Sequence, residues 1–325
     1  MNNFCSPANE NNKYCFSEKS LKKMVSIWNS FNTVKITITN TNTNGSKKMY
    51  NSLNNKLKKI AGNNKYWLWT GIIEKLAENK LSKKPENLKK LMKIKRDIRA
   101  IAKRDLRPEK PESWYKNPKT WLSNYDIQNV MTQYEQTRKY KYRFLGVFPI
   151  DFSVQSENGQ CMYSDICSID VGKNLKSCKK FIGLITNLDK HNEPGSHWTS
   201  TFIVIDPKLP TYGAYYYDST TGSIPKYLYD FIYKIKQQCD ALFPDKNFVI
   251  HENKKQHQYK NSECGVFSMI FQIRWINKHI VKKNNTSFKE IIANPFINDA
   301  SMLKVRDALF RPSTKMELLQ KNIYL

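Results

Sequence analysis

A cysteine at the start of a predicted helix is the side chain of this 325-residue chain best suited to covalent chemistry. Cys264 stands in Asn-Ser-Glu-Cys-Gly-Val-Phe, where a polar stretch meets an apolar run. The unpaired N–H groups and the dipole at a helix start favour a thiolate. Gly265 would leave space for a substrate backbone. Cys264 is therefore a candidate nucleophile, and a small buried core cysteine is the alternative.

A nucleophilic cysteine needs a nearby base and a third group that orients the base. Of only five histidines, His197 directly precedes an apolar run at 201–205 that predicts a strand, so its ring would be held rigidly. Asp218 ends the next predicted strand, and neighbouring strands can place a carboxylate beside an imidazole. The alternatives are a strand-end histidine bonded to a backbone carbonyl and a turn aspartate. Asp206 is a rival orienting group, although the proline after it is typical of a turn.

A glutamine in the loop before the cysteine completes the candidate site. Gln258 lies six residues before Cys264. Acyl transfer develops an oxyanion, which a side-chain amide and the N–H of the nucleophile can stabilise together. This chemistry requires no metal or organic cofactor. The spacing of Cys161, Cys167 and Cys178 matches no zinc pattern.

The elements that must position these groups point to an α+β fold. Strands and helices alternate irregularly after residue 112, without the strict repeat of a parallel sheet. We expect strands at 144–152, 201–205, 214–217 and 247–250, and helices at 121–134, 224–241 and 265–280. Residues 1–112 carry helical stripes that end at Pro108 and Pro111. We therefore predict a mostly helical, basic module over 1–112 and a second domain over 113–325.

The composition restricts the partners and the compartment. The net charge of +26 attracts polyanions, and residues 81–110 hold twelve Lys and Arg against four Asp and Glu. This strip is a candidate DNA contact, and an ordinary solvated surface is the alternative. No apolar run is long enough to span a membrane, so we expect no membrane insertion. The N-terminal residues do not resemble a secretory signal. We therefore expect a protein that is not secreted, with seven free thiols in a reducing compartment.

The order and spacing of these residues resemble the Ulp1/adenain-like superfamily of cysteine proteases. The matching elements are His197-Trp198, then Tyr217-Asp218-Ser219, then Gln258 followed by Cys264-Gly265, with Glu263 as the acidic residue before the cysteine. Trp121-Leu122 with Asp126-Ile127 is similar to the segment that opens the catalytic core in that family. The basic N-terminal module and residues 297–311 look most like the polyprotein-processing core proteases of large cytoplasmic DNA viruses, of the African swine fever virus type.

The resemblance implies a permuted papain-like fold over about 115–325 and a Cys264–His197–Asp218 triad with Gln258 at the oxyanion. It also implies cleavage of viral polyprotein or capsid precursors after small residues, in a Gly-Gly or Ala-Gly context, with Trp198 as one wall of a narrow channel. Such an enzyme would act in the host cytoplasm and the virion. Two alternatives remain: a deconjugase of SUMO or ubiquitin, and a nucleic-acid-binding scaffold with a vestigial triad.

Overall fold

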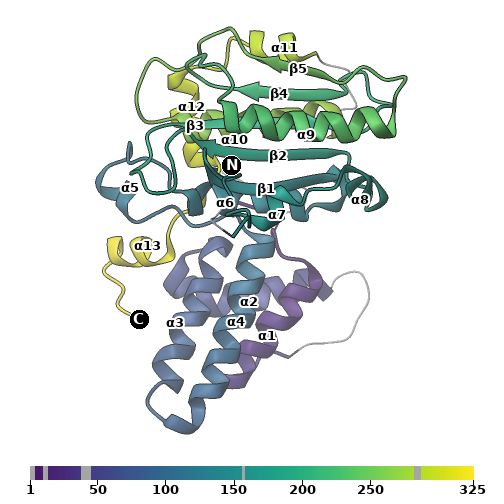
Figure 1. Ribbon diagram of the computed structural model, residues 1–325. Coiled ribbons are helices and arrows are strands. Elements are labelled where there is room, and N and C mark those ends of the chain that lie inside the picture. Colours follow the sequence, from purple (N-terminus) through teal and green to yellow (C-terminus); the bar gives the residue numbers. More distant parts are fainter. Residues whose placement is uncertain (1–3, 10–13, 38–44, 156–157, 282–286) are drawn as a thin grey trace. The chain divides into compact units, whose positions relative to one another are not determined.

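The chain divides into two compact units. The computed structural model describes all residues except 1–3, 10–13, 38–44, 156–157 and 282–286. One unit comprises residues 119–306, and the other comprises residues 1–118 together with 307–325 (Figure 1). The sequence predicted one boundary after residue 112. The structure differs because the C-terminal residues return to the helical unit, a long-range association that no local pattern in the sequence records.

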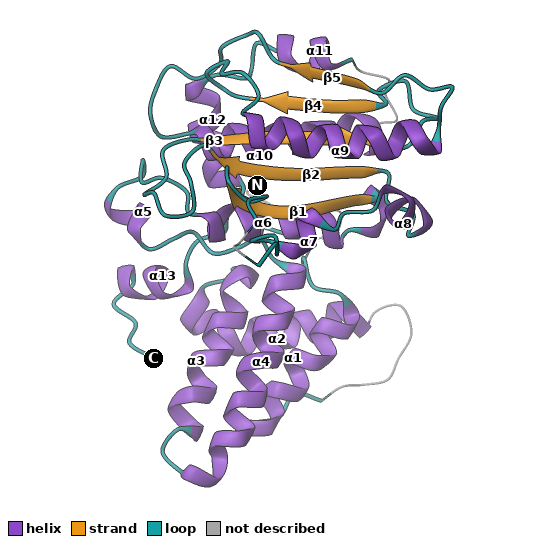
Figure 2. Cartoon of the chain, viewed as in Figure 1, coloured by secondary structure: helices purple, strands orange, loops and turns teal. Residues whose placement is uncertain are grey.

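A five-stranded sheet forms the centre of the unit of residues 119–306 (Figure 2). Its order is β1-β2-β3-β4-β5, with parallel pairs at both ends and antiparallel pairs between them. The strands are β1 (Tyr142–Pro149), β2 (Phe181–Asn187), β3 (Trp198–Val204), β4 (Gly213–Tyr217) and β5 (Val249–Glu252). The central strands are almost wholly buried, as expected for a sheet covered on both faces.

Helices cover both faces of this sheet. On one face α9 (Lys226–Leu242) buries Leu228, Phe231, Ile232 and Ile235 at helical spacing against apolar side chains of the strands. On the other face α6 packs on β1 and α10 packs on β3. Besides α9, the helices of this unit are α6 (Asn124–Gln136), η3 (Arg138–Tyr140), α7 (Ser164–Cys167), α8 (Val171–Lys176), α10 (Cys264–Trp275), η4 (Ile276–Val281), α11 (Phe288–Ala293) and α12 (Asp299–Ala308).

Two polar residues fix the position of the mostly apolar helix α10 (Cys264–Trp275). Ser268 Oγ donates to the carbonyl of Trp198 at 3.0 Å, and Gln272 Nε2 donates to the carbonyl of Leu184 at 2.9 Å. Cys264, Ser268 and Gln272 recur every four residues and therefore share one face of the helix. Because Ser268 and Gln272 bond to the backbone of β3 and β2, that face, with Cys264 at its start, is directed toward the sheet.

The second unit is built around four helices: α1 (Glu18–Phe31), α2 (Gly45–Ala61), α3 (Trp69–Leu81) and α4 (Leu88–Asp105). Ser17 caps α1 by accepting from the N–H of Ser20. Leu91, Ile94, Ile98 and Ile101 form the buried stripe of α4 within one continuous apolar core. Three short helices complete the first part of the unit: η1 (Tyr66–Leu68), η2 (Pro85–Asn87) and α5 (Ser113–Lys116). The helical module that the sequence predicted is therefore present.

The C-terminal residues are tied to this helical unit by buried polar contacts. Arg311 is 5 % exposed, and it pairs with Glu109 at 2.7 Å and donates to the carbonyl of Trp67 at 2.9 Å. Helix α13 (Thr314–Gln320) approaches α3 so closely that a β-carbon at Gly71 would lie 2.4 Å from Thr314 Oγ1. A buried charge persists when it is paired and hydrogen-bonded, so these contacts specify where residues 307–325 pack.

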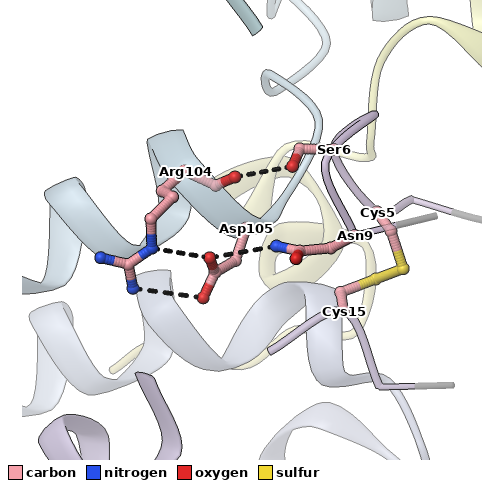
Figure 3. Close-up of a disulfide and its surroundings, with 6 residues drawn as sticks. All are labelled: Cys5, Ser6, Asn9, Cys15, Arg104 and Asp105. Carbon is pink, nitrogen blue, oxygen red and sulfur yellow. Dashed lines mark hydrogen bonds and ion pairs between the residues drawn. A yellow bond between two sulfur atoms is a disulfide. The ribbon is translucent and has the colours of Figure 1, made fainter. Parts of the chain in front are cut away.

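Two disulfides correct the prediction that all seven cysteines are free thiols. Cys5 pairs with Cys15, with 4.8 Å between their α-carbons, and Cys161 pairs with Cys167. Beside the first disulfide, Asp105 accepts hydrogen bonds from Asn9 and Arg104 and so holds the N-terminal segment to the end of α4 (Figure 3). The prediction was wrong because pairing depends on proximity in the fold. The free cysteines among the described residues are Cys178, Cys239 and Cys264.

The expectation of no membrane insertion can be compared with the length and hydropathy of the helices. Within the described part of the chain, no helix has both the length and the apolar character needed to cross a membrane. The longest of the helices, α4, carries a charged or polar residue at most of its exposed positions.

Candidate active site

The antiparallel pairing of β3 and β4 brings His197 and Asp218 together. Ser200 of β3 pairs with Tyr217 of β4, so the start of β3 and the end of β4 lie at the same edge of the sheet. His197 directly precedes β3, and Asp218 directly follows β4. The His197 Nε2 atom lies 2.7 Å from Asp218 Oδ1.

Backbone groups and a buried asparagine hold the Asp218 carboxylate in place. The N–H of Thr220 donates to Oδ1 at 2.8 Å, and the N–H of Gly222 donates to Oδ2 at 3.1 Å. Asn253 bonds to both the N–H and the carbonyl of Asp218. Burial opposes ionisation, but the hydrogen bonds from His197 and Thr220 outweigh it and lower the pKa of Asp218. The residue is therefore a fixed anion that orients the imidazole.

Cys264 is the first residue of α10 and interacts with the His197 imidazole. It is 3 % exposed, and it shares a cavity with His197 and Gln258. Burial opposes the charged imidazolium, but hydrogen bonds with Asp218 and Cys264 and the charges of both outweigh it, raising the pKa of His197 to about 9. Since Nε2 contacts Asp218, Nδ1 is the ring nitrogen left to interact with another group. This arrangement favours the imidazolium form of His197.

Gln258 lines the same cavity, with its amide orientation fixed by a buried serine. Ser219 Oγ donates to Gln258 Oε1 at 2.7 Å, which leaves the amide nitrogen as the group that can donate toward a substrate. One of its two N–H groups donates to the carbonyl of Lys260 at 2.5 Å. The carbonyl of Ser219 also accepts from the N–H groups of His257 and Gln258. The loop before Cys264 is thus held to the end of β4.

Trp121 borders the cavity that contains Cys264, and Trp198 borders a neighbouring cavity. The first cavity has a volume of about 430 Å³, and the neighbouring one of about 480 Å³ extends along the loop of residues 187–195. Trp121, which is 49 % exposed, lines both, and Trp198 lines the second. The Trp198 indole donates to the carbonyl of Leu122 at 3.1 Å, so the position of its ring is fixed.

The structure distinguishes Asp218 from Asp206 as the partner of His197, and it corrects the interpretation of Gly265. Asp206 forms an ion pair with Lys180, whereas Asp218 is the carboxylate that contacts His197. Gly265 does not leave space for substrate. A β-carbon there would meet Leu122 at 3.0 Å and Trp198 at 3.2 Å, so the space is already filled by packed side chains.

Several supporting residues could not be recognised from the sequence. Ser219, Asn253 and Ser268 orient the glutamine, the aspartate and the helix. The only signal was polarity at Ser268 within an apolar helix. Among the described residues, no group of three or more His, Cys, Asp and Glu side chains is arranged to hold a metal ion.

Comparison with solved structures identifies the fold as that of a viral cysteine protease. A crystal structure of the African swine fever virus pS273R protease matches 96 % of this chain and 97 % of its own, with a TM-score of 0.58 and 17 % identity. The predicted α+β fold with a helical N-terminal module is therefore confirmed.

Comparison of sequences identifies the particular relatives. A proposed thiol protease of Acanthamoeba polyphaga mimivirus is 30 % identical over 178 residues, which is 53 % of this chain and 54 % of the relative. The cysteine protease of African swine fever virus is 29 % identical over 140 residues, 43 % of this chain and 47 % of the relative. The chain thus spans about half the length of each of these relatives. No family model matches it.

Proposed function

We propose that this protein is a thiol protease whose nucleophile is Cys264, whose base is His197 and whose orienting group is Asp218. The observation that carries the proposal is the interaction of one imidazole with both a buried carboxylate and a sulfur at a helix start. The similarity to two viral proteins named as thiol or cysteine proteases supports the same reaction.

The reaction proceeds through a thioester. The Cys264 thiolate attacks the scissile carbonyl, and the Gln258 amide and the Cys264 N–H stabilise the oxyanion. As the carbon–nitrogen bond breaks, His197 transfers its proton to the departing amine. Water then attacks the thioester, His197 accepts the proton from the water, and the acid product and the thiolate are released. Each side chain is restored, so no cofactor is consumed.

The proposed substrate is a protein cleaved after a small residue, in a Gly-Gly or Ala-Gly context. Trp121 lines the cavity of Cys264, and the fixed indole of Trp198 lines the neighbouring cavity, so we expect bulky side chains beside the scissile bond to contact these rings. Viral polyprotein or capsid precursors are the favoured class, with action in the host cytoplasm and the virion, because both relatives are viral. A SUMO or ubiquitin tail, which also ends in Gly-Gly, is the competing substrate.

Covalent labelling tests the proposal directly. A peptide ending in Gly-Gly with a vinyl-type electrophile should modify Cys264, and mass spectrometry of the digested protein should locate the adduct. Cys264→Ala should abolish both labelling and peptide cleavage. Cys178→Ala is the matched control, because that free thiol is exposed and outside the site. Cleavage by Cys264→Ala would refute the mechanism, and preference for a SUMO conjugate over a precursor peptide would refute the substrate class.

A contact between the helical unit and DNA is a second element of the proposal. Residues 81–110 include Lys83, Lys84, Lys89 and Lys93, all of which are exposed. Among the described residues, none of these four forms an ion pair, whereas Lys95 and Arg99 on the same helix pair with glutamates of α3. Exposed lysines without a carboxylate partner can contact a phosphate backbone. The vestigial-triad scaffold predicts the same contact without labelling of Cys264.

A further inference from the structure

The loop that carries the candidate oxyanion donor and leads to the nucleophile has little regular structure of its own. Residues 253–263 lie between β5 and α10, and they contain no helix or strand. Their position therefore depends on contacts with other segments. Besides the contacts with Ser219, two hydrogen bonds anchor this loop to one helix near the end of the unit, α12.

These two hydrogen bonds are made by the residues next to Gln258 and Cys264, the two groups whose spacing matters for the proposed reaction. The N–H of Tyr259, the residue after Gln258, donates to Asp299 Oδ2 at 3.0 Å. Glu263, the residue before Cys264, accepts from Arg306 Nη1 at 3.1 Å. Asp299 and Arg306 are seven residues apart, so they lie two turns apart on one side of α12, about 10 Å along its axis. A rigid helix thus contacts both ends of the segment 259–263.

Arg306 is buried to a degree that is unusual for a charge. Its side chain is 1 % exposed and that of Glu263 is 3 % exposed. Nη2 of the same guanidinium donates to the carbonyl of Thr120, next to Trp121 in the cleft wall. An apolar pair of similar size would commonly serve stability as well as a buried ion pair. The planar fork of arginine instead fixes direction, here toward the nucleophile and the cleft wall together.

We infer that Asp299 and Arg306 are positioning residues that set the spacing between the Gln258 amide and Cys264, and that Arg306 also sets the wall at Trp121. The inference rests on the proposed protease function and adds to it. Neither residue touches the reacting atoms, and both act through their neighbours in the loop. A displacement of about 1 Å in such a site can slow turnover about 10²-fold.

Two pairs of variants test this role. Asp299→Ala removes the acceptor of the Tyr259 N–H, whereas Asp299→Asn keeps an oxygen there. The alanine variant should lose about 10-fold to 10²-fold in kcat, and the asparagine variant should restore most of it. Arg306→Lys keeps the charge but loses the fork, and it should lower kcat similarly. Lys304→Ala, at an exposed position of the same helix, is the matched control and should leave kcat unchanged.

A double variant separates positioning from folding. Glu263→Leu/Arg306→Met replaces the ion pair with apolar groups, so it should fold even where Arg306→Lys does not. Turnover is expressed per active site, counted by titration with the electrophile. Alkylation by iodoacetamide, which forms no oxyanion, should stay within about threefold of wild type, because His197 and Asp218 belong to other segments. Parallel loss of alkylation and cleavage would make the role merely structural and overturn the inference.

The outcomes for the wild-type protein keep the two proposals apart. Wild-type protein that is not labelled at Cys264 would refute the protease function itself. If the wild-type protein is labelled and active but the double variant has an unchanged kcat, only the positioning role is refuted. Reduced kcat per titrated site in Asp299→Ala and in the double variant, with rescue by Asp299→Asn, would support it.

Discussion

The Nε2 atom of His197 lies 2.7 Å from the Oδ1 atom of Asp218, and the two side chains differ sharply in exposure. The carboxylate is 2 % exposed, whereas the imidazole is 16 % exposed. An anion buried beside a partly accessible ring fixes both the ring orientation and its charged form. The effect of this contact on cleavage can therefore be measured by changing the pH and by substituting Asp218.

The rate of peptide cleavage should decline as the pH rises through about 9. Burial opposes the charge on His197, but Asp218 and Cys264 raise its pKa to about 9. Below that pH the imidazolium can protonate the departing amine, and above it the proton is lost, so the change is a loss of rate with increasing pH. The pH profile of kcat/KM with a peptide substrate measures this limb. A limb near pH 6.5 would mean that the two partners do not act on the ring.

Asp218→Asn should lower turnover by about 10²-fold to 10⁴-fold while the protein stays folded, because the neutral amide no longer stabilises imidazolium. The alkaline limb should also move to lower pH. Asp206→Asn is the matched control, since Asp206 pairs with Lys180 instead, and it should retain turnover within about threefold. A loss of turnover in Asp206→Asn but not in Asp218→Asn would assign the orienting role to Asp206.

Gln258→Ala should reduce kcat by about 10²-fold to 10³-fold with a smaller change in KM, as expected for loss of one oxyanion donor. Ser219→Ala should have a weaker effect in the same direction, because Ser219 orients the amide without touching the substrate. Steady-state kinetics of both variants provide the measurement. A change below about threefold for Gln258→Ala would remove this residue from the site.

Gly183→Ala should destabilise the unit of residues 119–306 by about 1–3 kcal/mol through overpacking. A β-carbon there would lie 2.2 Å from both Gln272 Oε1 and the Tyr142 hydroxyl, the buried pair between α10 and the sheet. Thermal or denaturant unfolding measures the loss. Gly45→Ala, where an added β-carbon meets no atom within 4 Å, is the control. Equal unfolding midpoints for the two variants would contradict this packing.

Lys89→Gln/Lys93→Gln should reduce the salt dependence of DNA binding. Each lost phosphate contact lowers the slope of log K against log salt by about 0.9, so the pair should lower it by about 2. Lys234→Gln/Lys246→Gln removes the same charge from exposed sites of the other unit and should leave the slope unchanged. Cleavage of a free peptide should be the same in all these proteins. Equal slopes for both pairs would indicate a diffuse charge effect.

The sequence predicted most of the main elements and the residues that meet at the candidate site, but it missed strand β2 (Phe181–Asn187). His197 and Asp218 each adjoin a strand with a clear apolar pattern, and Cys264 begins a clearly apolar helix, so local patterns were informative. The contacts that hold the site are long-range. Arg306 meets Glu263 across 43 residues, and no local periodicity records such a pair. The disulfides and the filled space at Gly265 were misread for the same reason.

The return of residues 307–325 to the helical unit affects the order in which the two units can be completed. A ribosome releases the chain from its N-terminus, so all of residues 119–306 emerge before Arg311 reaches Glu109 or Thr314 reaches Gly71. During synthesis the sheet-containing unit therefore has all its residues available first, although its sequence starts second. A nascent chain held with residue 306 just outside the ribosomal exit tunnel should have a formed candidate site and a helical unit that still lacks α13.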